Sequence, residues 1–588
     1  MSKYTQNRRE FMRIVVVGST AAGLSLPLIG CGDDTKTEMV PEPLDVGLVY
    51  PQGVASGDPK PNSIILWTRV EPGEAEMATV TYEVALDEDF SMLVSSGELT
   101  VDATTDHTVR LKVTDLEPYT RYYYRFQSRA TPSITGRTKT APAPDADVAV
   151  RFAVASCQDY NGRNYYSWRA LADEPDVDFV LFLGDYIYET AADPRFQEMG
   201  GRSVTLPDGL SLSEDGKSKA ALTLADYRSL YRQYRSDPDL QAMHAMAPFV
   251  ISWDDHEFAD DSWQDHSTHF NEAQGDEGNN ERRTAASRAW YEYQPADVTY
   301  DKNATFPNDL SIYRDFRFGK HCELFMTDTR SYRADHIIPE GPDNSAVGKF
   351  EANSALGSRN FVLKSGFDEV EAAGAPSMLG DTQKQWLLDG MTGSSATWKV
   401  WGNQVQAAQM LIDLSSFDML PESYRSTFYF STDQWDGYRS EREAVYSALS
   451  GVDNVVALAG DIHAFYASEL QADYDNPAEP IAVEYVVAGI SSTPVQTITQ
   501  RTVSGNDVLV ALGLGDLVPR FDELLQAASP HYKYARSNEN GVGIVDVSAD
   551  AFEMTFLKVN DPTAESFDGE VSKARFRTPV GSRRVEVL

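Results

Sequence analysis

Hydrophobic and polar residues follow two different patterns along this chain, and the change divides it into two parts. Between residues 46 and 141, short runs at 63–68, 78–84, 107–113 and 122–126 alternate apolar and polar positions and are separated by turn-forming residues. Alternation with a period of two is typical of strands with one buried face, and closely spaced turns are typical of β-sandwiches. We therefore predict an N-terminal β-sandwich domain of the immunoglobulin or fibronectin type over residues 46–141.

Beyond residue 148 the pattern changes to continuous apolar runs that alternate with helical stretches. Short apolar runs that end in polar loops indicate strands buried on both faces. We predict one large α/β domain over residues 148–588, which follows a Pro/Ala-rich hinge at 140–144 and ends in a hairpin. The predicted strands lie at 148–156, 177–184, 249–253, 323–328, 398–402 and 455–460, the helices at 224–234, 280–293, 382–391 and 440–449, and the hairpin at 541–547 and 551–559.

The first 31 residues have the pattern of an export signal. The adjacent arginines Arg8 and Arg9 precede an apolar run at 14–28, and a lipobox-like Leu-Ile-Gly precedes Cys31. We expect export by the twin-arginine machinery, a lipid anchor at Cys31, a polar tether at 32–45, and a location in the periplasm or at the cell surface. The alternative is that Cys31 is an ordinary residue near a conventional cleavage site. The apolar run is too short to span a bilayer, so no other membrane contact is expected.

Composition excludes several classes of protein. Of the 588 residues, 42% are hydrophobic and 24% are charged, which is typical of globular proteins. The 51 basic residues against 89 acidic ones give a formal net charge of −38. Because such a surface repels phosphate backbones at long range, nucleic acid is not expected as the main partner. The acidity indicates a solvated surface or, as an alternative, adaptation to a salty habitat.

Polar side chains of the metal-ligand type follow most of the apolar runs. In α/β folds, ligands bind where strands end. Two neighbouring cations need a shared oxygen ligand, and Asp185 is the natural bridge. Carboxylates and amides suit a hard divalent ion, whereas thiolate, phenolate and imidazole favour a transition metal. The sequence therefore predicts a metal cluster built from the segments 156–159, 184–189, 254–257, 402–404 and 460–463.

These motifs resemble those of the PhoD-like alkaline phosphatase/phosphodiesterase family. The resemblance runs from about residue 51 to 559 and rests on the segments 53–59, 66–69, 184–189, 253–257, 327–333, 398–404 and 460–463. It implies a metallophosphoesterase-type four-layer α/β/β/α sandwich behind the N-terminal β-sandwich. It also implies hydrolysis of small phosphate monoesters or diesters by a metal-activated hydroxide that attacks phosphorus directly. A phospholipase D-like phosphodiesterase is an alternative, and a non-catalytic cell-surface binding protein is a second one.

The resemblance also implies which residues hold the metals. An iron(III) ion would be bound by Cys157, Asp185, Tyr188 and His463. A calcium ion beside it would be bound by Asp185 and Asp461, with help from Asp255 and Asn403. The sequence departs from the family pattern at 258–261, where Asp260 and Asp261 stand in place of an asparagine pair. The remaining ligands of the second metal are therefore open among Asp254, Asp255, Asp260, Asp261, Asn403 and Gln404.

For several of the candidate site residues the sequence leaves a second role open. Cys157 is expected as a ligand, but a disulfide with Cys322 is the default for an exported protein; Cys322 itself lies in an apolar run and is expected to be a buried small residue. His256 is expected to assist the leaving group or hydrogen-bond the phosphoryl oxygen, with a structural histidine as the alternative. Arg330 is equally compatible with a bidentate phosphate contact and with pairing to a carboxylate such as Asp328.

Two weaker signals complete the prediction. Tyr188, if the resemblance is set aside, could pack on a neighbouring loop, as tyrosines beyond strand ends often do. The segment 529–531, Ser-Pro-His, resembles a family segment near the site.

Overall fold

The computed structural model describes residues 49–588 except 74–76, 195–196, 199, 268–276 and 339–358. The predicted signal at 1–31, with the anchor at Cys31, and the tether at 32–45 lie outside the described residues. None of the helices in the described part of the chain combines the length and the apolar character that a bilayer-spanning segment needs.

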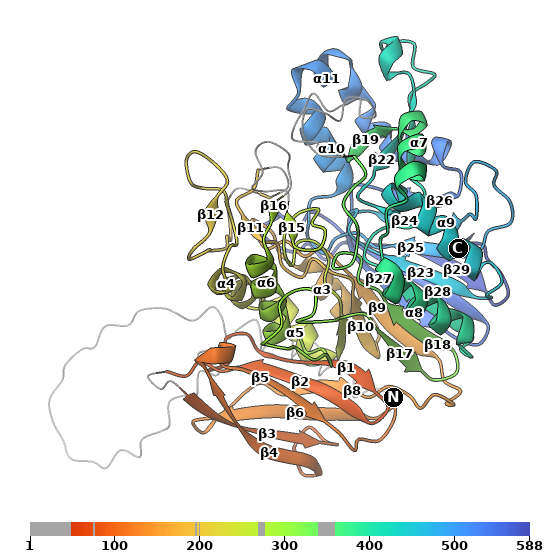
Figure 1. The fold of residues 1–588 in the computed structure, drawn as a ribbon. Helices are drawn as coiled ribbons and strands as arrows, with labels where there is room; N and C mark the ends of the chain where they lie inside the picture. The colour runs from red at the N-terminus through yellow and green to blue at the C-terminus, as the bar shows by residue number, and fades with distance from the viewer. Residues whose placement is uncertain (1–48, 74–76, 195–196, 199, 268–276, 339–358) are drawn as a thin grey trace, which may run out of the picture.

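Two mixed sheets pack face to face at the centre of the molecule (Figure 1). Phe179 and Phe318, which come from opposite sheets, stack with ring centroids 4.3 Å apart. In the first sheet the strands are β9 (Val150–Ala155), β10 (Phe179–Phe182), β14 (Phe249–Ile251), β27 (Asn540–Val547), β28 (Ala551–Val559), β29 (Val571–Pro579) and β30 (Glu586–Val587), continued by three N-terminal strands. In the second sheet they are β17 (Arg314–Phe318), β18 (Cys322–Met326), β20 (Trp398–Gly402), β23 (Val455–Ala459), β24 (Phe465–Leu470), β25 (Ala482–Val486) and β26 (Tyr532–Arg536).

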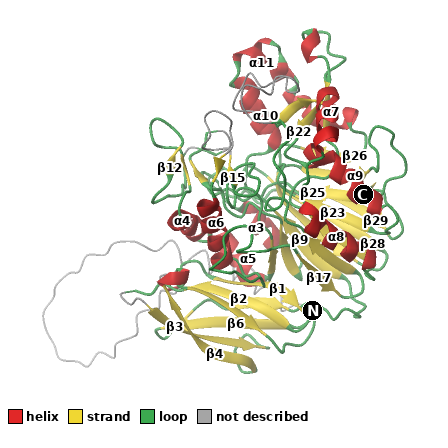
Figure 2. Cartoon of the chain, viewed as in Figure 1, coloured by secondary structure: helices red, strands yellow, loops and turns green. Residues whose placement is uncertain are grey.

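Helices cover the outer face of each sheet (Figure 2). On the first sheet, Trp168 packs on Phe182 with centroids 6.2 Å apart, and on the second, Trp386 packs on Phe325 at the same separation. This is the α/β/β/α order that the resemblance implies. The first layer holds α3 (Tyr166–Ala172), α4 (Leu224–Tyr234), α5 (Pro238–Met246) and α6 (Asn280–Tyr293), and the last holds α8 (Gly380–Gly393), α9 (Arg439–Leu449), α10 (Val495–Ser504) and α12 (Phe521–Ala528).

Local sequence explains where two of these helices begin. Thr223 and Asp226 form a capping box at the start of α4, so that two otherwise unpaired backbone N–H groups are satisfied. Asp237 accepts hydrogen bonds from the N–H groups of Asp239 and Leu240, and Pro238 occupies the first turn of α5. Every strand and helix predicted beyond residue 148 occurs, with ends shifted by a few residues.

The N-terminal strands form two packed layers that share a sheet with the rest of the chain. The strands β1 (Val54–Lys60), β2 (Ser63–Arg69) and β5 (Thr108–Val113) extend the first large sheet, because β1 pairs with β14. A Cβ atom at Gly57 would lie 2.6 Å from the carbonyl oxygen of Phe249, so this pairing requires glycine. The immunoglobulin-like character of this unit and the domain borders stay predictions. Its second layer is β3 (Met77–Ala85), β4 (Leu93–Asp102), β6 (Arg121–Ser128), β7 (Thr131–Pro132) and β8 (Gly136–Lys139).

Smaller elements surround the ends of the central strands, and the sequence prediction did not include them. A three-stranded sheet of β19 (Asn360–Leu363), β22 (Thr427–Ser431) and β21 (Leu411–Asp413) lies beside α12. The other elements are α7 (Lys364–Gly374), α11 (Asp507–Ala511), β11 (Thr190–Ala191), β12 (Leu210–Ser211), β13 (Lys219–Ala220), β15 (His266–Ser267), β16 (Glu277–Gly278) and the 3₁₀ turns η1 (Ala103–Thr105), η3 (Glu422–Tyr424), η4 (Trp435–Tyr438), η5 (Leu514–Asp516) and η6 (Val518–Arg520).

Candidate metal centre

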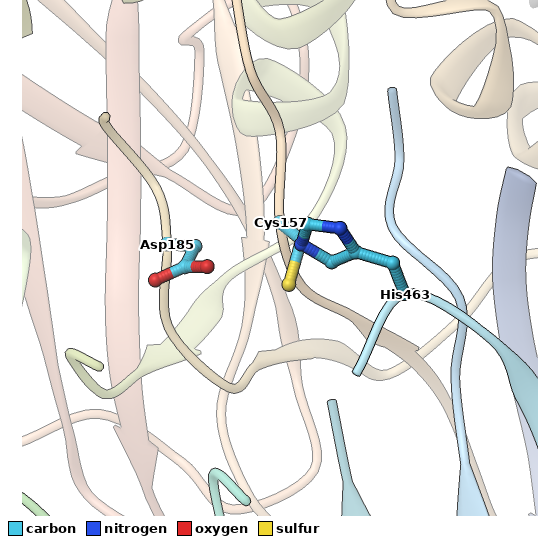
Figure 3. A group of neighbouring side chains, drawn as sticks. All are labelled: Cys157, Asp185 and His463. Atoms are coloured by element: carbon cyan, nitrogen blue, oxygen red, sulfur yellow. The ribbon is translucent and has the colours of Figure 1, made fainter. Parts of the chain in front are cut away.

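Three donor residues from separate strand ends meet at one place (Figure 3). Cys157 follows β9, Asp185 follows β10, and His463 follows β23. Their donor atoms, a sulfur, a carboxylate oxygen and an imidazole nitrogen, all lie within 4.8 Å of one another, and all three side chains are buried. Cys157 and Cys322 are both free, so the disulfide alternative is wrong and the thiol of Cys157 is available as a ligand.

The backbone of this site is held in the left-handed region at four non-glycine residues. The φ angles are 56° at Cys157, 57° at Asp185, 62° at Asp461 and 54° at His463. Such residues cost of order 1 kcal/mol each and are found mainly where function requires them. The turns direct the side chains away from the ends of the strands and toward a common point. Gly184 permits this, because a Cβ atom there would lie 2.5 Å from that of Asp254.

Tyr188 completes the group of four that the resemblance implies for iron. Its phenol oxygen lies 3.1 Å from Oδ2 of Asp185 and 3.0 Å from Nε2 of His463, and it accepts a hydrogen bond from the Ser492 hydroxyl at 2.7 Å. Nδ1 of His463 lies 2.8 Å from the carbonyl oxygen of Thr493. A carbonyl only accepts, so Nδ1 carries the proton and Nε2 faces the group with its lone pair.

Carboxylates extend the site on the other side of Asp185. Asp185, Asp255 and His256 form one close group, Asp254, Asp255 and Asp461 a second, and Asp255, Asp260 and Asp261 a third, each within 4.8 Å. Asp185 and Asp255 are therefore shared between groups. Oδ1 of Asp255 is buried and has no hydrogen-bond partner, although Nη2 of Arg330 lies 3.4 Å away. This oxygen is placed to accept a cation.

Burial and mutual repulsion raise the pKa values of Asp185, Asp254 and Asp461. Burial and then the charge of Asp255 raise the pKa of Asp185 well above its ordinary value, and burial also raises that of Asp254. The pKa of Asp461 rises to about 6, mainly because of burial. Burial likewise raises the pKa of the Cys157 thiol and of the Tyr188 phenol. Bound cations would reverse these shifts, because they stabilise the ionised forms.

Arg330 is the cation that partly balances this charge. It is buried, and it pairs with Asp254, with Asp255 at 3.4 Å, with Asp433 at 2.9 Å and with Asp461 at 3.2 Å. Asp433 also accepts hydrogen bonds from Arg333 at 2.9 Å. The structure therefore places Arg330 in the carboxylate-pairing arrangement, and its guanidinium does not line the cavity described below.

His256 and two glutamates shape the same region. Nδ1 of His256 lies 2.7 Å from Oε2 of Glu189, and its Nε2 lies 3.8 Å from Oδ1 of Asp260. Burial would lower the pKa of His256, but Asp255 and Glu189 raise it well above its ordinary value. Glu257 accepts backbone N–H bonds from Asp185 at 2.9 Å and from Asp254 at 2.8 Å, and so ties two site loops together.

Three predicted residues do not line the cavity described below. The amide of Asn403 donates to the carbonyl of Val405, and its oxygen accepts from the Trp435 indole at 3.4 Å, so both ends of the amide have partners. Gln404 hydrogen-bonds Ser252 and Thr329 at 2.6 Å and 3.0 Å and is likewise paired. Nε2 of His531 donates to the carbonyl of Gln409 at 2.7 Å. None of the three lines the cavity, and their assigned roles stay predictions.

The sequence prediction also missed several residues of the site. Glu189 and Glu257 stand within quoted motifs but received no role. Ser492 and Thr493 follow the buried strand β25, and a polar run after an apolar one was the available signal. Asp433 follows β22, whose pattern was not recognised as a strand, so nothing in the sequence indicated it.

A cavity of about 220 Å³ opens above the site. Asp185, Tyr188, Asp255, His256, Asp461 and His463 form its floor. The proposed functional residues thus line a cavity that opens to the surface.

Comparisons with known proteins decide the family. Residues 152–556 match the family model described as PhoD-like phosphatase, and residues 46–142 match the model of its N-terminal domain. The chain belongs to the PhoD-like phosphatase family. It is 33% identical over 502 residues to alkaline phosphatase D of Bacillus subtilis (strain 168), which covers 83% of this chain and 76% of that protein. It also resembles a solved structure of PhoD, with a TM-score of 0.70 and 28% identity over 92% of each chain.

The donor atoms of this PhoD-like chain fit bound metal ions. The thiol, phenol and imidazole beside Asp185 are the donor types of a transition-metal site, and the cluster of Asp254, Asp255 and Asp461 is typical of a hard divalent ion. Oδ1 of Asp255 has no hydrogen-bond partner, and the pKa of Asp185 is raised. Both observations indicate that a bound cation would stabilise these carboxylates. The family resemblance and this geometry agree on a metal-dependent site.

Proposed function

We propose that the protein is an exported phosphoric ester hydrolase of the alkaline phosphatase D type, acting on small phosphate monoesters or diesters. The observation that carries this proposal is the meeting of Cys157, Asp185 and His463, of which Asp185 and His463 line the cavity. In the proposed assignment, Cys157, Asp185, Tyr188 and His463 hold iron(III), and Asp185, Asp255 and Asp461 hold calcium. Bound in this way, the metals would supply Lewis acidity to the phosphoryl oxygens and acidify a bound water for direct in-line attack.

The chain's own residues prepare this chemistry. Glu189 holds the His256 ring, and the His256 imidazole lines the cavity, where it can serve as a proton donor. His256 would then protonate the leaving oxygen. Arg330 holds Asp254 and Asp461 in place, which assigns it a positioning role. The buried floor excludes bulk water from these groups.

The test is hydrolysis of p-nitrophenyl phosphate and bis(p-nitrophenyl) phosphate by metal-loaded protein, with and without calcium. We expect turnover of at least one ester and its loss in Asp185→Ala. The control Asp389→Ala, on the exposed side of α8, should behave as the wild type. Absence of turnover of both esters by metal-replete protein would favour the non-catalytic binding protein.

Metal identity has its own readout. An iron(III)–phenolate pair absorbs visible light, so the purified protein should be coloured, and Tyr188→Phe should remove the phenolate band and change the visible spectrum. A colourless, iron-free and fully active preparation would refute the iron assignment while leaving the hydrolase in place.

A further inference from the structure

The cavity above the metal centre has two chemically different halves. Its floor carries the acidic and ligand residues described above, whereas the wall farther from the floor is mostly apolar, with Thr499 and Thr502 among its polar residues. The helical segment from α10 to α12 supplies most of this wall, and the facing side comes from Ile412 and Leu414 at β21 and Phe430 of β22. The residues of the floor account for the proposed hydrolysis of the phosphate ester. The apolar residues of the wall have no role in that reaction.

The apolar wall is joined directly to the metal centre. The backbone N–H of Val495, the first residue of α10, donates to the carbonyl oxygen of His463 at 3.3 Å. At the other end of the segment, Phe521 contacts Phe430 edge-on with centroids 5.1 Å apart, and Phe430 contacts Phe361 at 5.3 Å. Figure 1 shows α10 and α11 beside β19 and β22 at this end of the molecule. A group bound at the wall would therefore be continuous with a phosphoryl group at the floor.

The charges of the residues that line the cavity limit the kind of substrate group that the wall can bind. Among the described residues that line the cavity, none is lysine or arginine, and Asp260, Asp261 and Asp433 are acidic. A second phosphate or a carboxylate on the substrate would meet no lysine or arginine there. An uncharged apolar group would instead be removed from water against Ile498 and Leu524, which are only partly buried in the free protein.

We infer that the wall formed by α10 to α12 binds an apolar group of the substrate, so that phosphate esters carrying an alkyl chain are preferred. This inference rests on the proposed hydrolase function and adds a specificity-determining surface to it. Ile498 and Leu524 are the residues that set the preference, because they face the cavity and lie in the helices outside the metal floor.

The experiment measures kcat/KM of the metal-loaded protein for methyl, butyl and hexyl p-nitrophenyl phosphate, each below its micellar concentration. Burial of a methylene group at the wall predicts a gain of about two- to fourfold per methylene, and so at least about 30-fold from methyl to hexyl. In Ile498→Ser and Leu524→Ser the ratio of hexyl to methyl should fall at least about fivefold. Leu524→Met should keep the ratio, since it preserves an apolar side chain of similar size.

The matched control is Val508→Ser in α11, because Val508 is 54% exposed and lies outside the cavity lining. This variant should retain the wild-type ratio. Equal kcat/KM for the methyl and hexyl esters would overturn the inference but leave the hydrolase intact. A chain-length preference that both serine variants keep would also overturn it, since the alkyl group would then bind elsewhere. Failure to hydrolyse any of the three esters while p-nitrophenyl phosphate is still turned over would overturn the inference alone. Failure on p-nitrophenyl phosphate and its bis ester as well would overturn the proposed function together with it.

Discussion

The imidazole Nδ1 of His463 lies 2.8 Å from the carbonyl oxygen of Thr493, and this contact orients Nε2 toward Cys157, Asp185 and Tyr188. The residue before Thr493 acts on the same group, because the Ser492 hydroxyl lies 2.7 Å from the Tyr188 phenol oxygen. The loop after β25 thus supports two of the proposed iron ligands without supplying a ligand itself. Supports of this kind tune metal affinity.

Removing the Ser492 hydroxyl should weaken metal binding while leaving the ligands in place. We expect Ser492→Ala to lower the affinity for the transition metal by about 10- to 100-fold and to shift the visible absorption band. Titration of metal-free protein, followed by absorbance, measures both. Ser447→Ala, in the outer helix α9, is the control. An unchanged affinity and spectrum in Ser492→Ala would show that the loop does not tune the metal.

Metal removal should destabilise the protein, because the buried carboxylates then repel one another without compensation. At a hundredfold excess of metal over its Kd, binding adds about 3 kcal/mol to the free energy of unfolding, which chelation should remove. Thermal unfolding with and without chelator measures this. In Asp185→Asn the effect of the chelator should largely disappear, and persistence of the full effect in that variant would place the stabilising metal elsewhere.

Loss of Arg330 should be most costly in metal-free protein. Burial would lower the pKa of Arg330, but its pairing with Asp254 and the other carboxylates raises it. Arg330→Gln removes the guanidinium that these carboxylates share, although Asp433 keeps its contact with Arg333. We expect a loss of about 3–5 kcal/mol in the free energy of unfolding of metal-free protein. The loss should be smaller with calcium bound, which denaturant titrations of both forms can compare. An equal loss in both forms would contradict a shared role of Arg330 and metal in neutralising the cluster.

Glu257 should affect stability through the loops that it joins. It accepts N–H bonds from Asp185, Tyr186 and Asp254, and an amide at this position leaves at least one buried donor unpaired. Glu257→Gln is expected to cost about 1–3 kcal/mol of unfolding free energy by urea titration. Glu71→Gln, whose side chain is 48% exposed, should change it by less than about 0.5 kcal/mol. Similar values for the two variants would show that Glu257 does not hold the loops.

His531 should make the folded state sensitive to acid. Burial lowers the pKa of His531 to about 4, below its ordinary value of 6.5. The unfolded chain therefore binds a proton between pH 6.5 and 4 that the folded one does not, so stability is full above pH 6.5 and falls as the pH approaches 4. Wild type should lose up to about 3 kcal/mol more than His531→Gln between pH 7 and pH 4. Parallel stability curves for the two proteins would contradict this.

The sequence by itself determined the elements whose patterns are local. The apolar runs that became β9, β10, β20 and β23 were readable because strands buried on both faces need continuous apolar residues. The residues of metal-ligand type after those strands could also be predicted, because parallel strands bring their carboxyl ends to one edge of the sheet. Helices α10 to α12 were not predicted, although the apolar residues of α10 and α12 recur at helical spacing.

Only the tertiary structure decided how these residues combine. It placed Asp433 beside Arg330 across 103 positions of sequence, and it directed Asn403 toward Val405 and Trp435, because such contacts depend on how two sheets and their loops pack. It also brought the apolar residues of α10 to α12 above the acidic floor, which no local pattern could specify. Local periodicity fixes which residues are buried, whereas the neighbours of a buried residue follow from the packing of distant segments.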